Sequence, residues 1–183
     1  MHDFATVRSI VKDATRHMDE QAIPQWDDIY PSDAILKDDI ERQQMHLVEV
    51  EGHVAGFIVI NEEQSPEYRD VAWQYSGQAM VIHRLTIDPA YERRGLAKRL
   101  MDFAEEVAAT TAYACIHLDA FTQNPAAIAL YENRGYRKAG KVRFRKGEFF
   151  CYEKRTTPCA SGIIDGMAEK SNLRITPPAG ETE

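Results

Sequence analysis

Hydrophobic positions at the start of the chain recur first with a helical and then with a strand-like period. Apolar residues are spaced as on one side of a helix at Phe4, Val7, Ile10, Val11 and Ala14. Segment 32–43 repeats that helical pattern, and β-branched residues then fill 46–50 and 54–60 on either side of a turn that contains Gly52. The pattern predicts two amphipathic helices followed by a β-hairpin.

A long polar stretch, 61–78, separates these elements from a regular alternation of strands and helices. The elements expected after it are, in order, a strand at 79–87, a helix that starts at Leu96, a strand at 113–120, a helix at 125–134, and a hairpin of 136–144 and 148–154. This order predicts an α/β fold of the mixed α+β kind, with a mixed central sheet and helices on both faces.

Strong patterning ends near Arg155, which divides the chain into a body, 1–155, and a tail, 156–183. Hydrophobic residues make up 44% of the chain and charged residues 28%, so the body has enough apolar side chains for one globular core. We therefore expect one domain over 1–155.

Charge and cysteine content exclude several classes of protein. The net charge of -7 argues against a general nucleic-acid or anionic-membrane binder, which needs a cationic surface. The three cysteines lack metal-ligand spacing, so neither a disulfide framework nor a metal site is expected. No stretch approaches the roughly 20 apolar residues of a spanning helix. These features predict a cytoplasmic protein without a metal.

Three segments resemble the GNAT acetyltransferase superfamily. They read VIHRLTIDP at 81–89, RRGLA at 93–97 and NPAAIALYENRGY at 124–136. The resemblance implies a mostly antiparallel sheet with one splayed strand pair. It also implies an acetyl-CoA-dependent N-acetyltransferase in which a primary amine attacks the acetyl group directly within a ternary complex.

The basic loop at 93–97 is the expected phosphate site. A helix N-terminus offers unpaired N–H donors and a positive dipole end, which suit the pyrophosphate of coenzyme A. The candidate cofactor-binding residues here are Arg93, Arg94, Gly95, Leu96, Ala97 and Lys98. Glu92 stands where the family usually has Gln or Arg, so no phosphate contact is assigned to it. By itself the segment would read as an ordinary strand-to-helix turn with a basic helix start.

Further roles follow from the resemblance, each beside a structural alternative. Tyr131 would be the general acid that protonates the departing thiolate, or else a core tyrosine. Asn124 and Ala127 would contact the arm of the cofactor, although Asn124 also suits a helix N-cap. The backbone at Leu85, Thr86 and Ile87 would bind the acetyl-pantetheine arm, or simply pair with neighbouring strands.

The amine side is less defined. His83, Glu62, Glu63 and Asp119 are candidates by type for the base that deprotonates the amine. By resemblance the leading helices and the 61–78 stretch form the acceptor pocket, which brings Trp26 and Tyr30 near it. The acceptor itself is not indicated by any motif.

One strand of the family pattern is missing at the start of the chain. Segment 172–176 has a strand-like pattern, so the tail is either disordered or supplies the missing edge strand. It would do so in its own subunit or in a neighbour's, the latter implying a homodimer.

Two other functions compete with catalysis. A non-catalytic acyl-CoA-binding module would keep the loop and the fold without needing Tyr131. A phosphate-loop nucleotide binder is disfavoured because the sequence has no GxxxxGK[ST] segment.

Overall fold

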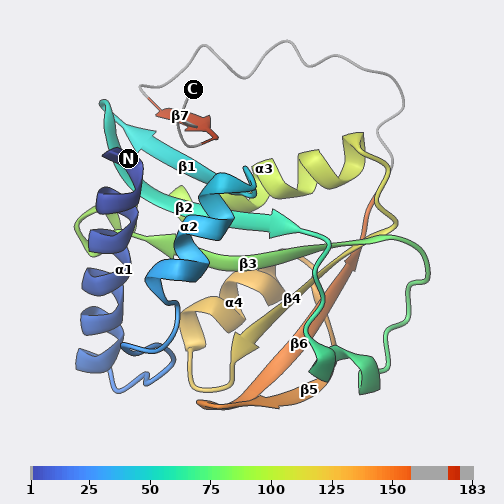
Figure 1. Cartoon of the computed structure of the whole chain (residues 1–183). Coiled ribbons are helices and arrows are strands. Elements are labelled where there is room, and N and C mark those ends of the chain that lie inside the picture. Colours follow the sequence, from blue (N-terminus) through green and yellow to red (C-terminus); the bar gives the residue numbers. More distant parts are fainter. Residues whose placement is uncertain (1, 158–172, 178–183) are drawn as a thin grey trace.

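A mixed sheet forms the centre of the molecule, in a computed structural model that describes residues 2–157 and 173–177. Its seven strands lie in the order β5-β6-β4-β3-β2-β1-β7 (Figure 1). Their bounds are β1 Met45–Val50, β2 His53–Asn61, β3 Ala79–Ile87, β4 Cys115–Phe121, β5 Arg137–Phe144, β6 Gly147–Arg155 and β7 Leu173–Thr176. Every neighbouring pair is antiparallel except β3 and β4, which confirms the mixed, mostly antiparallel sheet.

Helices cover both faces of this sheet, as the element order predicts. The described residues form α1 His2–Glu20, α2 Asp33–Glu41, α3 Leu96–Thr110 and α4 Pro125–Asn133, with short 3-10 turns η1 Pro66–Asp70 and η2 Pro89–Tyr91. On one face, α1 and α2 bury Val7, Ile10 and Leu36 against β1 and β2. No helix in the part of the chain that the structure describes is both long and apolar enough to cross a membrane.

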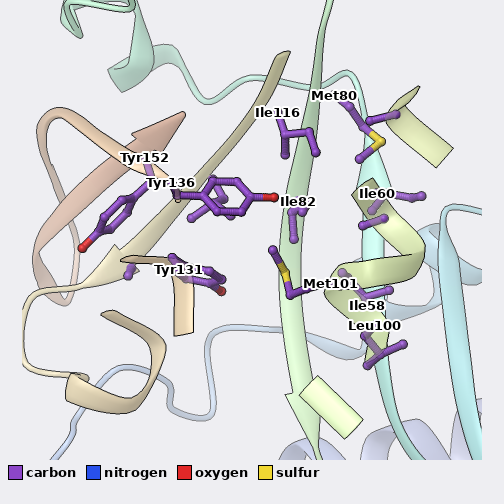
Figure 2. Close-up of a cluster of buried hydrophobic side chains, with 14 of the residues drawn as sticks. Ile58, Ile60, Met80, Ile82, Leu100, Met101, Ile116, Tyr131, Tyr136 and Tyr152 are labelled. Atoms are coloured by element: carbon purple, nitrogen blue, oxygen red, sulfur yellow. The ribbon is translucent and has the colours of Figure 1, made fainter. Parts of the chain in front are cut away.

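The larger core lies on the other face, under α3 and α4. Figure 2 shows Leu100 and Met101 of α3 reaching toward Ile58, Ile60 and Ile82 of the sheet. The cluster's tyrosines, Tyr131, Tyr136 and Tyr152, gather at its α4 end. Because strand side chains alternate between faces, the hydrophobic run of β2 serves both cores: Ile58 belongs to the cluster under α3, and Phe57 and Val59 to the cluster under α1 and α2.

The predicted start of β4 is two residues too early. The strand expected at 113–120 begins only at Cys115. The backbone N–H of Tyr113 instead donates to the carbonyl of Ala108, at 3.0 Å, and so ends α3. A helix leaves its last carbonyls without intrahelical partners, and the residues that follow satisfy them before a strand can start.

The strand nearest the C-terminus pairs with β1 in the same chain. Val48 lies opposite Ile175, and Glu49 opposite Arg174, in an antiparallel ladder. This places β7 at the edge of the sheet beside β1, and α1 is the first element of the described chain (Figure 1). Tail residues 158–172 and 178–183 lie outside the described residues.

A splay between β3 and β4 is the feature of the fold that opens the site. The parallel ladder runs from Ala79 opposite Cys115 only as far as Ile82 opposite Leu118. Beyond it β3 continues to Ile87 beside β2 alone, while β4 continues to Phe121 beside β6. Beyond Ile82 and Leu118, the backbone N–H and C=O groups that face between β3 and β4 therefore no longer hydrogen-bond to each other.

Candidate active site

A pocket of about 850 Å³ lies at this splay. Its wall combines α1 and the α1–α2 loop, the end of β3, the start of α3, β4, α4 and the β5–β6 hairpin. Segments more than a hundred residues apart in the chain therefore contribute to one cavity. We call the part near the start of α3 the donor side and the part near the α1–α2 loop the acceptor side.

The donor side ends at the N-terminus of α3. Gly95 precedes the helix with a φ of 75°, in the left-handed region that glycine adopts without a steric penalty. No side chain within the described residues caps the helix there, so its first N–H groups are not satisfied by a cap. The residues of this loop and first turn that line the pocket are Glu92, Arg93, Gly95, Leu96, Ala97 and Lys98.

Arg94 is placed differently from its neighbours. Its guanidinium lies over the ring of Tyr91, with 5.0 Å between the guanidinium carbon and the ring centroid. Arg93 has a positive φ of 59°, and both Arg93 and Lys98 belong to the pocket wall. Of the three basic residues at 93–98 that the sequence predicts to bind the cofactor, Arg93 and Lys98 line the pocket and Arg94 does not.

Glu92 faces a residue of α1 that sequence reasoning missed. The Nε2 atom of His17 lies 3.4 Å from Oε2 of Glu92, and both side chains line the pocket. The same ring nitrogen lies 2.7 Å from Nε2 of Gln21. No motif identifies His17, because its place beside the loop before α3 depends on how α1 crosses the sheet.

The end of β3 forms the middle of the wall. Residues His83 to Ile87, including Leu85 and Thr86, line the pocket beyond the last β4 pairing. Phe57 pairs with Thr86 but Val59 pairs with His83, so β3 has one extra residue, and Arg84 takes a φ of 46°. Such a bulge redirects the strand and breaks its regular pairing.

His83 is poorly suited to be the base. Burial, followed by the nearby Arg84 charge, lowers the pKa of His83 to about 4. Its Nε2 atom lies 3.0 Å from Oδ1 of Asn61. A neutral imidazole with so low a pKa is a weak proton acceptor at neutral pH.

Asp119 is better suited to that role. It lies on β4 at the pocket wall, and burial raises its pKa to about 6, against the opposing hydrogen bond from Tyr68. The Tyr68 hydroxyl donates to Oδ2 of Asp119 at 2.6 Å. Tyr68 belongs to η1, inside the polar 61–78 stretch whose position the sequence did not define.

The other two carboxylates considered as bases lie elsewhere. Glu62 accepts hydrogen bonds from Gln78 and from the hydroxyl of Tyr113. Glu63 is ion-paired with Arg42. Both carboxylates therefore have partners at the surface.

Tyr131 lies in the pocket wall on α4 and is only 6% exposed. Its ring packs against those of Tyr136 and Tyr152, with centroids 6.0 and 5.9 Å away (Figure 2). Burial, and then the charge of Asp119, raises the pKa of Tyr131 above its usual value. The hydroxyl therefore keeps its proton at neutral pH and can serve as a donor.

Asn124 caps α4 and also joins two segments. Its Oδ1 accepts from the N–H of Ala127 at 3.0 Å, and its Nδ2 donates to Oε1 of Gln25 at 2.9 Å. Asn124, Ala127 and Gln25 all line the pocket. The N-cap role therefore coexists with a position on the wall.

Aromatic side chains dominate the acceptor side. Trp26 and Tyr30 pack edge to face, with ring centroids 6.5 Å apart, and both line the pocket with Phe144 and Phe149. At the rim, Asp27 forms ion pairs with Arg145 and Lys146, which connects the α1–α2 loop to the β5–β6 hairpin. In residues 2–157 and 173–177, no group of three His, Cys, Asp or Glu side chains could hold a metal ion.

Comparisons with known proteins agree with this geometry. The model of the Acetyltransferase (GNAT) family matches residues 9–136. N-alpha-acetyltransferase RimI of Mycobacterium tuberculosis is 35% identical over 66 residues, 34% of this chain. Uncharacterized protein ML0378 of Mycobacterium leprae is 37% identical over 59 residues, 32% of this chain. The matches cover 37% and 16% of these relatives' own lengths, so the chain aligns with part of each.

Solved structures extend the likeness to the whole fold. A putative acetyltransferase from Staphylococcus aureus Mu50 superposes with a TM-score of 0.67 at 26% identity, over 86% of this chain and 95% of the other. A GNAT acetyltransferase from Streptococcus agalactiae superposes with a TM-score of 0.76 at 19% identity, over 85% and 91%. PaiA N-acetyltransferase from Thermoplasma acidophilum, solved with coenzyme A, reaches 0.62 at 18% identity, over 84% and 93%. The chain therefore belongs to the acetyltransferase (GNAT) family.

Proposed function

We propose that this protein transfers the acetyl group of acetyl-CoA directly to a primary amine while both substrates are bound. The observation that carries the proposal is the continuity of the pocket. One cavity joins an uncapped helix N-terminus, an unpaired strand edge, a protonated phenol and a half-buried carboxylate. These four features are what a thioester donor and an amine acceptor require.

The donor would lie along the splay with its phosphates at α3. The first N–H groups of α3 and the side chains of Arg93 and Lys98 provide hydrogen bonds and positive charge for the pyrophosphate. The pantetheine arm has amide groups that can pair with the free backbone edge at 85–87, between β3 and β4. Asn124 and Ala127 border this path at the start of α4.

Acetyl transfer needs one proton acceptor and one proton donor. Asp119, ionised above about pH 6, would take a proton from the acceptor ammonium and release the neutral amine. The amine nitrogen attacks the carbonyl carbon, and backbone N–H groups at the end of β3 stabilise the oxyanion. The C–S bond then breaks, and the Tyr131 hydroxyl gives its proton to the leaving sulfur. The nitrogen of the new amide gives up its extra proton to the Tyr131 oxygen, directly or through water, which restores the phenol, and Asp119 releases its proton to solvent.

Direct attack is favoured over a covalent acetyl-enzyme because the described thiols are unsuited to it. Cys115 and Cys151 are fully buried. Burial raises the pKa of Cys151 to about 12 and also raises that of Cys115. The thiolate is the nucleophilic form, so neither side chain is activated. Cys159 lies outside the described residues.

A panel of primary amines tests the proposal through coenzyme A release. Turnover should give intersecting double-reciprocal lines, as for a ternary complex, and mass spectrometry should detect no acetylated protein before amine is added. Acetyl-CoA should also raise the melting temperature, while ATP should not. If acetyl-CoA stabilises the fold but a broad panel of small amines and peptides yields no release, the protein is a non-catalytic acyl-CoA-binding module instead.

A further inference from the structure

A buried ion pair joins the bulge of β3 to the acceptor side of the pocket. Nη2 of Arg84 donates to Oδ1 of Asp39 on α2 at 2.6 Å. Nη1 of the same guanidinium donates to the hydroxyl of Tyr30 in the α1–α2 loop at 3.0 Å. The side chains of Arg84 and Asp39 are only 10% and 4% exposed. Three segments therefore meet at one guanidinium.

This arrangement is costly for the fold. Arg84 has a positive φ of 46°, which is sterically unfavourable for a residue with a long side chain. Nε of Arg84 and Oδ2 of Asp39 are buried without a hydrogen-bond partner among the described residues. Buried polar groups usually find partners, and a well-packed apolar pair is often at least as stable as a buried ion pair. Outliers of this kind concentrate where a local conformation serves a function.

Two other contacts fix the same bulge from the sheet. The Thr86 hydroxyl donates to the carbonyl of Arg84 at 2.9 Å. On β2, Gly56 allows close approach, because a Cβ at that position would lie 2.5 Å from the carbonyl oxygen of Thr86. Both contacts come from strands of the sheet. The Arg84 side chain, in contrast, ties the bulge to α2 and to the α1–α2 loop.

We propose that Asp39 and Tyr30 are positioning residues: by holding the Arg84 guanidinium they fix the β3 bulge, and with it the backbone N–H groups that polarise the acetyl carbonyl. The inference rests on the proposed function, because it assigns the carbonyl of the donor to the free edge at 85–87. Segments of the acceptor side, α2 and the α1–α2 loop, thereby set the geometry of this edge. Acceptor binding against Tyr30 and polarisation of the thioester therefore share one structural element.

Infrared difference spectroscopy with acetyl-CoA labelled at its carbonyl carbon tests this proposal without any acceptor. Hydrogen bonding to the carbonyl shifts its stretch to lower frequency when the donor binds the wild-type protein. We expect Asp39→Asn to lose most of this shift and Tyr30→Phe to lose part of it. We call the hydrogen-bonded group of Arg84, Asp39 and Tyr30 the clamp. Donor affinity, measured by calorimetry, should change less than about threefold, because the phosphates bind at α3, away from the clamp.

Arg134→Lys is the matched control for the charge-preserving variant Arg84→Lys. The Arg134 side chain is 11% exposed and pairs with Asp102 and Glu105, so both arginines are buried to the same degree in ion pairs. Both substitutions should lower the melting temperature, since lysine cannot reproduce the planar fork of donors. Only Arg84→Lys should change the carbonyl shift. Tyr30→Phe removes a single hydrogen bond and keeps the ring, so it reports on the clamp even if Asp39→Asn does not fold.

Kinetics with an accepted amine provide a second reading. Asp39→Asn and Arg84→Lys should each lower kcat by about 10- to 100-fold with little change in the KM of acetyl-CoA. Because Asp39 acts through Arg84, the variant that combines Asp39→Asn with Arg84→Lys should have a kcat no lower than that of the slower single variant. An equal carbonyl shift in wild type, Tyr30→Phe and Arg84→Lys would overturn the clamp and leave the donor site intact. Absence of acetyl-CoA binding in the wild type would overturn the proposed function together with the clamp.

Discussion

The donor and acceptor sides of the pocket are built in different ways. The donor side consists of the end of β3, the start of α3 and the start of α4, all within residues 83–127. Two of its features in the proposal are backbone groups: the uncapped N-terminus of α3 and the strand edge that β4 leaves unpaired. The acceptor side uses side chains from α1, the α1–α2 loop, η1, β4 and the β5–β6 hairpin. Backbone groups can bind a constant donor in many sequences, whereas an acceptor is recognised by side chains that differ from protein to protein.

This difference explains which parts of the function the family determines. Membership indicates the donor, because the donor site proposed above uses a splay and a helix N-terminus that belong to the fold. The proposed acceptor side instead consists of side chains such as Trp26, Tyr30, Tyr68 and Asp119, which distant segments of the chain bring together. The variants below separate the two sides, beginning with the largest expected effect.

Tyr131→Phe should have the largest effect on turnover, because it removes the proton donor for the leaving sulfur while it keeps the ring. We expect kcat to fall by roughly 10²–10⁴-fold with little change in the KM of acetyl-CoA, measured by coenzyme A release. Tyr136→Phe is the control, since its ring packs against Tyr131 but does not belong to the described pocket wall. Wild-type kcat in Tyr131→Phe would leave Tyr131 with a packing role alone.

Asp119→Asn tests the acceptor side. Below about pH 6 the carboxyl is protonated and cannot accept a proton, so kcat/KM of the wild type should rise with pH through about 6. The Asn variant should lose that limb and fall by roughly 10²-fold at pH 8. The Tyr68 hydrogen bond opposes the rise of this pKa, so Tyr68→Phe should shift the limb to higher pH. A limb that persists in Asp119→Asn would assign the base elsewhere.

Thermal unfolding of the same Asp119 variant separates catalysis from folding. The pKa of Asp119 is about 6 in the fold, against an ordinary value of 3.8 for an aspartic acid in the unfolded chain. The folded state therefore binds the Asp119 proton more tightly than the unfolded state does. This proton contributes its full stability to the fold below about pH 4, and that contribution is lost as pH rises through about 6. Asp119→Asn should accordingly be at least as stable as the wild type at pH 8. A large loss of stability there would mean that the slower turnover reflects unfolding.

Charge reversal at the start of α3 tests the donor side. Lys98→Glu places a negative charge in the pocket wall and should weaken acetyl-CoA binding about tenfold by calorimetry, an effect that added salt reduces. Arg94→Glu is the matched control, because Arg94 lies over Tyr91 and is absent from the described pocket wall. It should weaken binding about threefold or less. Equal effects of the two changes would place both side chains at the phosphates.

Glu92→Gln should give the smallest change in affinity. The substitution removes a negative charge from the wall of the proposed phosphate site and leaves His17 next to an amide. We expect acetyl-CoA to bind about two- to threefold more tightly, because Glu92 is partly exposed and its repulsion is screened by solvent. Weaker binding would instead show that Glu92 holds His17 in a position that the donor needs.

Deletion of residues 172–183 should affect neither the donor side nor the acceptor side of the pocket. The ladder between β1 and β7 covers 47–50 and 173–176, away from the pocket wall. Its loss should lower the melting temperature by a few degrees, at roughly 2–4 °C for each kcal/mol in a domain of this size, with kcat unchanged. An unchanged melting temperature would show that β7 contributes nothing to the stability of the sheet.

The sequence by itself determined the parts of this protein that depend on local pattern. The periods of hydrophobic residues gave the order of helices and strands, since those periods follow from the geometry of each element. Gly95 before Leu96 and Asn124 before Pro125 indicated where α3 and α4 begin, because helix ends need a particular backbone or cap. With the motif at 124–136, these signals were enough to identify the family.

Only the tertiary structure decided which distant side chains meet. Tyr68 reaches Asp119, His17 faces Glu92, and Arg84 joins Asp39 to Tyr30, although the partners in each contact lie 45 to 75 residues apart in the chain. Each of these contacts depends on how a helix or loop crosses the sheet, which is set by the packing of whole apolar faces rather than by any local period. The raised pKa of Asp119 arises in the same way, because burial exists only after the 61–78 stretch has folded over β4.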